Sequence, residues 1–252
     1  MQAFLLAAGL GTRLKPLTDS IPKALLPLGG KTLLQWQIEK LKSVGITDIV
    51  LNVHHFPEQI IEYLQQNNNF GCNIQISDET EQLLETGGGL RKARALFGDA
   101  TAADGILVCN VDILSNVDLQ ALLAAYNPEE IGVVVVSERQ TQRYLLFDEN
   151  NILCGWTNIA TGELRGPIAD CQSPIANRPL AFSGMQVLNP RIFDCMDEVV
   201  AIKGDKFSLI DLYVTISKSE TLRAFIPEDY RMMDVGKIDQ LSEAEEFART
   251  FS

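Results

Sequence analysis

The 252-residue sequence predicts an α/β fold, in which helices cover both faces of a mostly parallel β-sheet. Three observations favour this class. Short apolar runs alternate with helical patterns over residues 1–136, as in strand–helix–strand crossovers. Two of the runs, Ile106–Asn110 and Ile131–Val136, are almost continuously apolar, which is typical of strands buried on both faces. Hydrophobic residues make up 46% of the chain, which at this length is enough to fill a large core.

The elements of residues 1–136 follow one another in a regular order. The expected strands are Gln2–Ala8, Ile46–Val53, Asn73–Ser77, Ile106–Asn110 and Ile131–Val136. The expected helices are Thr32–Val44, Pro57–Leu64, Thr86–Phe97 and Val117–Tyr126. The first helix shows the reasoning: its apolar residues at 33, 34, 38, 41 and 44 form one stripe, and Gly45 follows as a stop signal.

The pattern changes after residue 136, where strands become short and consecutive. The expected strands are Tyr144–Phe147, Ile152–Trp156, Ala181–Leu188 and Leu222–Ile226, and the expected helices are Phe207–Lys218 and Lys237–Thr250. Residues 148–151 predict a tight hairpin turn, and Asn158–Pro179 has the composition of a loop, in which Thr161-Gly162 suits the turn of a small hairpin. We expect this smaller β-rich section to pack beside the parallel core and to form half of a substrate cleft.

Composition excludes several classes of protein. The net charge of −12 argues against nucleic acid as a partner. No apolar run approaches the length of a membrane span, and the N-terminus lacks the features of a secretory leader, so we expect a cytoplasmic protein without a membrane partner. The five cysteines are odd in number, widely spaced and never arranged as C-x-x-C, which favours reduced thiols: Cys72, Cys109, Cys154, Cys171 and Cys195.

The first 31 residues form a positive segment in this acidic chain. Their charged residues are four basic side chains and one acid, Asp19, so the segment carries +3: Arg13, Lys15, Lys23 and Lys31. The segment also contains Gly9 and Gly11, directly after the first strand. Glycines let backbone N–H groups approach a phosphate closely. The sequence therefore predicts an anionic ligand at the end of the first strand.

Two common phosphate-binding motifs do not fit this segment. A dinucleotide-binding fingerprint, G-x-G-x-x-G/A, would need a small residue where Leu14 stands. A Walker A loop ending at Gly30-Lys31-Thr32 would need glycine where Leu25 stands. The ligand loop must therefore be of another kind.

The segment resembles the signature of the sugar-1-phosphate nucleotidyltransferases, L-A-x-G-x-G-x-R-x-x-P-x-T, then P-K-x-L, then P. The matching residues are Leu6–Thr18, Pro22–Leu25 and Pro27. This resemblance implies a Rossmann-like fold of the nucleotide-diphospho-sugar transferase type, as a single domain over residues 1–252. Residues 1–136 would be its nucleotide-binding half, and residues 137–252 its sugar-binding half with a C-terminal helix. The segment Glu85-Thr86-Gly87-Gly88-Gly89 resembles the corresponding segment of the small bacterial N-acetylmuramate-1-phosphate uridylyltransferases.

Two aspartates are the candidate metal ligands. Asp112 follows the strand Ile106–Asn110, at the carboxyl edge where open α/β sheets bind ligands, although a strand can also simply end on a polar residue. Asp234 stands before the final helix and could instead be its N-cap. The resemblance implies that both bind Mg²⁺, with Val111 and Lys237 departing from the family's glycine and threonine.

The resemblance also implies roles for other residues. The catalytic set is Arg13, Lys23 and Asp112. The nucleotide-binding set is Leu6, Ala7, Ala8, Gly9, Gly11, Thr12, Glu85, Thr86, Gly87 and Asn110. The sugar-phosphate-binding set is Lys23, Arg143, Ser183 and Gly184. Arg165 could serve the same anion, but Arg143 and Arg165 equally fit ordinary surface arginines of a hairpin. We expect bare N–H groups at the start of the helix Thr86–Phe97, directed at the site.

The implied reaction is attack by a sugar 1-phosphate oxygen on the α-phosphorus of a nucleoside triphosphate, in line and without a covalent enzyme intermediate. The products are a nucleotide-sugar and pyrophosphate. UTP with N-acetylmuramate 1-phosphate is the first expectation. The alternatives are GTP with a mannose or heptose 1-phosphate, a phosphocholine cytidylyltransferase, and a non-catalytic sensor of nucleotide-sugars on the same fold.

Overall fold

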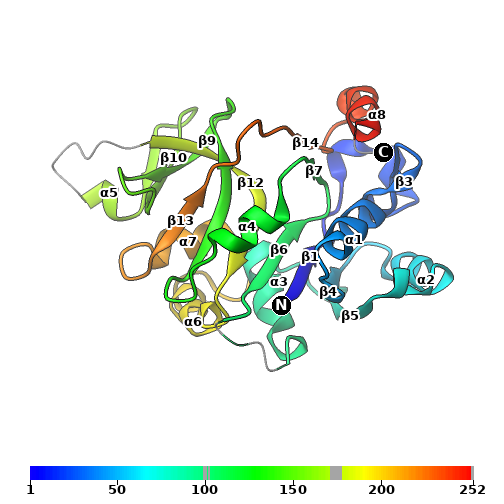
Figure 1. Ribbon diagram of the computed structural model, residues 1–252, viewed down its shortest axis with the longest axis horizontal. Coiled ribbons are helices and arrows are strands. Elements are labelled where there is room, and N and C mark those ends of the chain that lie inside the picture. The colour runs from blue at the N-terminus through cyan, green and yellow to red at the C-terminus, as the bar shows by residue number, and fades with distance from the viewer. Residues whose placement is uncertain (99–100, 102, 171–177, 251–252) are drawn as a thin grey trace.

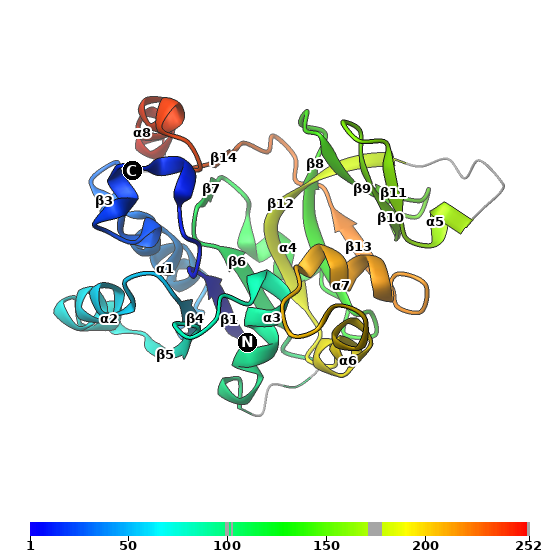
Figure 2. The same cartoon turned by 180° about the vertical axis from the view of Figure 1, so that it is seen from behind.

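The computed structural model describes residues 1–98, 101, 103–170 and 178–250. In this part of the chain, ten strands form one wide sheet (Figure 1) with helices on both sides (Figure 2). Its main strands are β1 (Gln2–Leu6), β4 (Asp48–Val53), β5 (Asn73–Asp78), β6 (Ile106–Asn110), β8 (Gly132–Ser137), β9 (Arg143–Phe147), β10 (Leu153–Asn158), β11 (Glu163–Arg165), β12 (Arg178–Leu188) and β13 (Leu222–Phe225). The short pairs are β2 (Pro27–Leu28) with β3 (Lys31–Thr32), and β7 (Ile113–Ser115) with β14 (Met232–Asp234).

Four parallel strands, in the order β6-β1-β4-β5, form the core that the sequence predicts. Leu6 lies beside Asn52 on one side and beside Asn110 on the other. Because the carboxyl ends of parallel strands meet at one edge, the ends of β1, β4 and β6 and the loops that follow them converge there. This edge carries the candidate site.

Side chains of these strands alternate between two hydrophobic cores. Phe4 and Leu6 point into one core, and Ala3 and Leu5 into the other. The first core is covered by α3 (Glu85–Lys92), α6 (Ile192–Lys203) and α7 (Leu209–Ile216). The second is covered by α1 (Leu33–Ser43), α2 (Pro57–Gln66) and α4 (Leu119–Ala125). The expectation that helices cover both faces of the sheet is therefore confirmed.

The β-rich section continues the same sheet through β12. This strand is antiparallel to β6 and β9 on one side and to β8 on the other. The expected strand Ile131–Val136 corresponds to β8, which does not pair directly with β6 because β12 lies between them. The register of β12 shifts between Phe182 and Gln186, and Gly184 there has φ +70°. The bulge thus bends β12 at the carboxyl edge of β6.

Several elements of the second half differ from the expectation. Asn158–Pro179 is not only loop: β11 pairs with β10 as the small hairpin, and α5 (Pro167–Asp170) follows, while residues 171–177, with Cys171, lie outside the described residues. Helix α6 has no expected counterpart. The expected helix Lys237–Thr250 is a short 3₁₀ turn followed by α8 (Leu241–Arg249). The turn at 148–151 is confirmed, with the Asp148 carboxylate accepting from two backbone N–H groups.

Within the described residues, no helix is long and apolar enough to cross a membrane. No disulfide joins the four described cysteines. Burial raises the pKa of the Cys109 thiol to about 12, so this strand cysteine is an unreactive thiol near neutral pH.

Candidate active site

The loop after β1 folds back tightly on itself. Gly11 has φ +63°, and its carbonyl accepts hydrogen bonds from the backbone of Leu14 at 2.8 Å and from the Thr18 hydroxyl at 2.9 Å. A Cβ at Gly11 would lie 2.8 Å from Thr18 Cγ2, so only glycine fits. Thr12 and Arg13 begin a short exposed turn directly after it. The glycine therefore shapes the loop that presents Arg13.

Lys23 is the buried cation of this loop. Its side chain is only 9% exposed, and its ammonium donates a hydrogen bond to Asp112, which lies 89 residues further along the chain. An ammonium has three donors, and this contact uses one of them. Burial next to the carboxylate therefore holds a point charge at the carboxyl edge of the sheet, with donors left over.

Asp112 and Asp234 are brought together by the ribbon of β7 and β14. Asp234 pairs with Ile113, and the Val235 N–H donates to the Asp112 carbonyl at 2.9 Å. Partial loss of solvent and the negative charge of Asp112 raise the pKa of Asp234, although neighbouring basic groups oppose this shift. The ribbon, and not sequence proximity, thus places the two carboxylates side by side.

The N-cap interpretation of Asp234 is wrong. Asp234 is the last residue of β14, and α8 begins only at Leu241. A Cβ at Gly236 would lie 2.9 Å from both Arg13 Nη2 and Asp234 Oδ1. The guanidinium and the carboxylate therefore flank the Gly236 backbone from the same side, and Arg13 joins the cluster of Lys23, Asp112 and Asp234.

Beside this cluster lies a cavity of about 310 Å³. It is lined by Leu6, Ala8, Gly9, Asn52, Leu83, Glu85, Thr86, Asn110, Asp112 and Ser208. Seven of these residues belong to the sets expected from the sequence. Asn52, Leu83 and Ser208 were missed, although Asn52 is a polar residue within the buried part of strand β4 and Ser208 begins a capping box. Ala7, Gly11, Thr12 and Gly87 do not line the cavity.

The glycines of α3 serve close packing. The N–H groups of Gly87 and Gly88 both donate to the Phe207 carbonyl, so the expected bare N–H groups are not present there. A Cβ at Gly87 would lie 2.5 Å from the Phe207 ring, and one at Gly88 would lie 2.2 Å from the Asp205 carbonyl. The start of α3 is thereby pressed against the segment before α7. The Thr86 hydroxyl accepts from the Leu209 N–H and ties the same two segments.

The expected sugar-phosphate residues lie in different places. Gly184 packs against Asn110, since a Cβ there would lie 3.1 Å from the Asn110 amide nitrogen. Ser183 is buried, and its hydroxyl has no hydrogen-bond partner among the described residues. Arg143 is exposed on β9, away from the residues that line the cavity. Arg165 stacks on Trp156 and pairs with Asp211, so it serves the fold.

The two aspartates supply too few ligands for a divalent cation by themselves, but they fit one whose other ligands are substrate phosphate oxygens and water. Among the described residues, no group of three or more His, Cys, Asp or Glu side chains could hold a metal. His54 and His55, which follow β4, instead contact the backbone carbonyls of Glu79 and Thr18. Mg²⁺ is usually bound through one or two carboxylates together with phosphate oxygens and water. The pair Asp112 and Asp234 fits that pattern.

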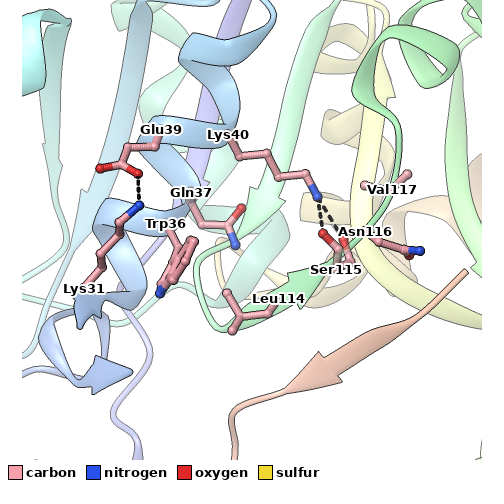
Figure 3. Close-up of a pocket in the computed structure, with 9 residues that line it drawn as sticks. All are labelled: Lys31, Trp36, Gln37, Glu39, Lys40, Leu114, Ser115, Asn116 and Val117. Atoms are coloured by element: carbon pink, nitrogen blue, oxygen red, sulfur yellow. Dashed lines mark hydrogen bonds and ion pairs between the residues drawn. The ribbon is translucent and has the colours of Figure 1, made fainter. Parts of the chain in front are cut away.

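A second cavity of about 390 Å³ lies between α1 and β7 (Figure 3). Here α1 holds β7 by its backbone: Gln37 donates to the Ile113 carbonyl at 2.6 Å, and Lys40 donates to the Ser115 carbonyl at 2.6 Å. Because Ile113 directly follows Asp112, these two bonds position the strand that carries the candidate metal ligand.

The chain is similar to known nucleotidyltransferases. The family model described as nucleotidyl transferase matches residues 2–144. The chain belongs to the nucleotidyl transferase family. An N-acetylmuramate α-1-phosphate uridylyltransferase of Caulobacter vibrioides is 30% identical over 233 residues, which are 90% of this chain and 88% of that protein. Another of the same name, from Neisseria meningitidis, is 41% identical over 52% of this chain and 56% of its own length.

Relatives that are named for other substrates match a similar share of this chain. A probable mannose-1-phosphate guanylyltransferase of Arabidopsis thaliana is 29% identical over 94% of this chain and 62% of its own. Among solved structures, a putative glucose-1-phosphate thymidylyltransferase of Bacillus anthracis superposes with TM-score 0.79 at 19% identity, over 99% of this chain and 95% of that one. Such low identity shows the shared fold, which confirms the predicted fold class.

Proposed function

We propose that this nucleotidyltransferase transfers a uridylyl group from UTP to a sugar 1-phosphate, with N-acetylmuramate 1-phosphate as the first candidate acceptor. The observation that carries the proposal is the cluster of Arg13, Lys23, Asp112 and Asp234 at the edge of the cavity beside β1 and β6. The two uridylyltransferase relatives support the choice of UTP and of the acceptor.

In the proposed mechanism, basic side chains of this protein offset the negative charge of the reacting phosphate groups. The remaining donors of the Lys23 ammonium bind oxygens of the α-phosphate and of the incoming sugar phosphate. The exposed guanidinium of Arg13 binds the β- and γ-phosphates, which leave as pyrophosphate, since its planar donors suit two oxygens at once. Asp112 orients Lys23 through their direct contact.

Asp112 and Asp234 would hold Mg²⁺, which supplies Lewis-acid stabilisation of phosphate oxygens when bound. The raised pKa of Asp234 fits this assignment, because burial and the negative charge of Asp112 both disfavour the ionised form of Asp234, and a bound cation would offset both. The structure needs no nucleophilic side chain for the reaction, since the acceptor phosphate itself attacks in line.

GTP with mannose 1-phosphate is the second candidate pair, because a probable mannose-1-phosphate guanylyltransferase matches 94% of this chain. The base and the acceptor are tested together by pyrophosphate release with Mg²⁺. UTP, GTP, CTP, ATP and dTTP are each combined with a panel of sugar 1-phosphates and with phosphocholine. We expect release with UTP and N-acetylmuramate 1-phosphate. Release only with another pair would overturn the substrate assignment, and nucleotide binding without release from any pair would favour a non-catalytic sensor.

A further inference from the structure

Two buried polar side chains behind the cavity have no role in the proposed chemistry. Asn52 near the end of β4 is 2% exposed, and Glu79 directly after β5 is fully buried. Burying a carboxylate is costly unless it is paired or well hydrogen-bonded. Among the described residues, no lysine, arginine or histidine forms an ion pair with Glu79. The hydrogen bonds of the pair must therefore account for its burial.

These hydrogen bonds form one continuous chain between two loops. Asn52 Oδ1 accepts from the backbone N–H of Ala7 at 2.7 Å and of Ala8 at 3.3 Å. Asn52 Nδ2 donates to Glu79 Oε1 at 2.7 Å, and Glu79 Oε2 accepts from the Leu84 N–H at 3.0 Å. One end of the chain is thus the loop after β1, and the other is the residue before α3.

The direction of each bond follows from its neighbours. The Ala7 and Ala8 N–H groups are donors, so the amide oxygen of Asn52 must face them and its nitrogen must face Glu79. Both oxygens of Glu79 then accept a hydrogen bond, one from Asn52 and one from the Leu84 N–H. No member of the chain can be turned round without leaving a buried donor against a donor.

The packing leaves the pair no freedom to move. A Cβ at Gly89 would lie 2.5 Å from Glu79 Oε1 and 2.9 Å from Asn52 Nδ2, so the bare backbone of α3 rests on the pair. Asn52 itself lines the cavity, together with Ala8 and Gly9 on one side and Glu85 and Thr86 on the other. The chain of bonds therefore runs between the two walls of the cavity.

We propose that Asn52 and Glu79 are positioning residues for the nucleoside triphosphate. They hold the segments Ala7–Gly9 and Leu84–Thr86, which carry the two walls of the cavity, at a fixed separation. The inference rests on the proposed function, in that the nucleotide occupies this cavity. The acceptor sugar phosphate binds by other residues, so the pair acts on nucleotide affinity and little on acceptor affinity.

The test exchanges the two functional groups. Asn52→Asp places a carboxylate against Glu79, and Glu79→Gln places an amide where two donors already point. In the double variant Asn52→Asp/Glu79→Gln, the new carboxylate accepts from Ala7 and Ala8, and the new amide donates to it and accepts from Leu84. Every buried donor then has an acceptor again. We expect each single variant to raise the KM for UTP by about tenfold and the double variant to restore it, with the acceptor KM changed less than twofold throughout.

A matched control separates positioning from loss of stability. Asn189 is also buried, and its Nδ2 donates to the Pro128 carbonyl at 2.8 Å after the end of β12, which lies at the opposite edge of the sheet. Asn189→Asp should lower the melting temperature while leaving the KM for UTP unchanged. If the double variant were as impaired as the single ones, or if the acceptor KM rose equally, the positioning role would be wrong.

A second readout needs no substrate. Residue-level amide hydrogen exchange should speed up about tenfold at Ala7, Ala8 and Leu84 in each single variant and return to the wild-type rate in the double variant. A wild-type protein without pyrophosphate release or UTP binding would overturn the proposed function. Unchanged exchange in the single variants would overturn the pair itself, whatever the activity.

Discussion

The basic side chains of the two halves of the sheet have different partners. In the β-rich half, arginines pair with acids that belong to the fold: Arg165 with Asp211, Arg178 with Glu138, Arg191 with Glu220, and Arg223 with Glu130. In the loop after β1, Lys15 pairs with the exposed Asp19 and Lys23 pairs with the candidate metal ligand Asp112, while Arg13 forms no ion pair among the described residues. The difference separates cations that stabilise the fold from cations that remain available to an anionic substrate.

The same contrast explains the fate of the candidate anion ligands. Arg165 and Arg13 are both arginines that follow a glycine-containing turn, and from the sequence alone each is a candidate to bind a phosphate. In the structure, Arg165 stacks on Trp156 and pairs with Asp211, while Arg13 lies beside Asp234 and forms no ion pair within the described part of the chain. The following predictions test this division, from the largest expected effect to the smallest.

Asp112→Asn should lower kcat by about 10³-fold or more, because the variant loses one of the two carboxylates for Mg²⁺ and the charge that orients Lys23. The measurement is pyrophosphate release at saturating Mg²⁺ and UTP. The matched control is Asp118→Ala, which removes the N-cap of α4 and should cost about 1 kcal/mol of stability with kcat unchanged. Activity of Asp112→Asn within tenfold of the wild type would contradict the metal assignment.

Lys23→Met should lower kcat/KM for UTP by about 10²-fold, since the apolar chain fills the buried space without the ammonium. Steady-state kinetics at fixed acceptor concentration measures the loss. Lys42→Met is the control, because Lys42 is an exposed lysine of α1 whose ammonium contacts the Phe70 carbonyl. Equal behaviour of the two variants would remove Lys23 from the group of site cations.

Arg13→Gln should raise the KM for UTP and the inhibition constant of pyrophosphate by about tenfold each, because one charged, two-pronged phosphate contact is lost. Product-inhibition kinetics provides both constants. Arg94→Gln, which breaks the exposed ion pair with Asp194, should change neither. A change in the acceptor KM alone would mean that Arg13 binds the sugar phosphate instead.

Arg165→Gln should leave both substrate KM values unchanged and lower stability at pH 7 by about 1 kcal/mol. Burial opposes ionisation of Asp211, but hydrogen bonds from Lys203, Ser208 and Arg165 outweigh it and hold the pKa of Asp211 well below its ordinary value of 3.8. A lowered carboxyl pKa stabilises the fold above the ordinary value, and this stabilisation is lost as the pH falls below it.

The unfolding free energies of wild type and Arg165→Gln should therefore converge as the pH falls below about 3.8. Urea unfolding at pH 7 and at pH 2.5 measures the difference. A raised acceptor KM in this variant would return Arg165 to the cations that bind substrate, and a stability difference independent of pH would exclude Asp211 as the partner that matters.

Lys40→Met should give the most pH-dependent effect on stability. Burial lowers the pKa of Lys40 to about 8 from 10.5, so the folded state gives up a proton that the unfolded chain keeps between these values. The stability of wild type relative to the variant should consequently rise with pH over that range, by at most about 1.4 kcal/mol per pH unit. Thermal unfolding at pH 7.5, 8.5 and 9.5 follows the trend, and a relative stability that falls with pH would contradict the burial of the ammonium.

Local patterns predicted the N-terminal half well. Strands β1, β4, β5 and β6 and the helices between them appear where apolar periodicity placed them. The periodicity is a property of neighbouring residues, because each helix of this half buries one stripe and its central strands are buried on both faces. The same patterns left α6 unassigned, and the place of β12 between β6 and β8 could not be read from them, because strand order depends on pairing between segments far apart in the chain.

For the candidate site, too, local sequence patterns predicted one part and the tertiary structure decided the other. The sequence by itself determined which side chains are candidates for the chemistry, since Arg13, Lys23, Asp112 and Asp234 stand in short motifs, and seven of the expected residues line one cavity. Only the tertiary structure decided which charges meet. Lys23 and Asp112 are 89 residues apart, Asn52 and Glu79 are 27 apart, and Arg165 and Asp211 are 46 apart. A contact between distant segments depends on how strands pair and helices pack, so no local stretch of the sequence predicts it.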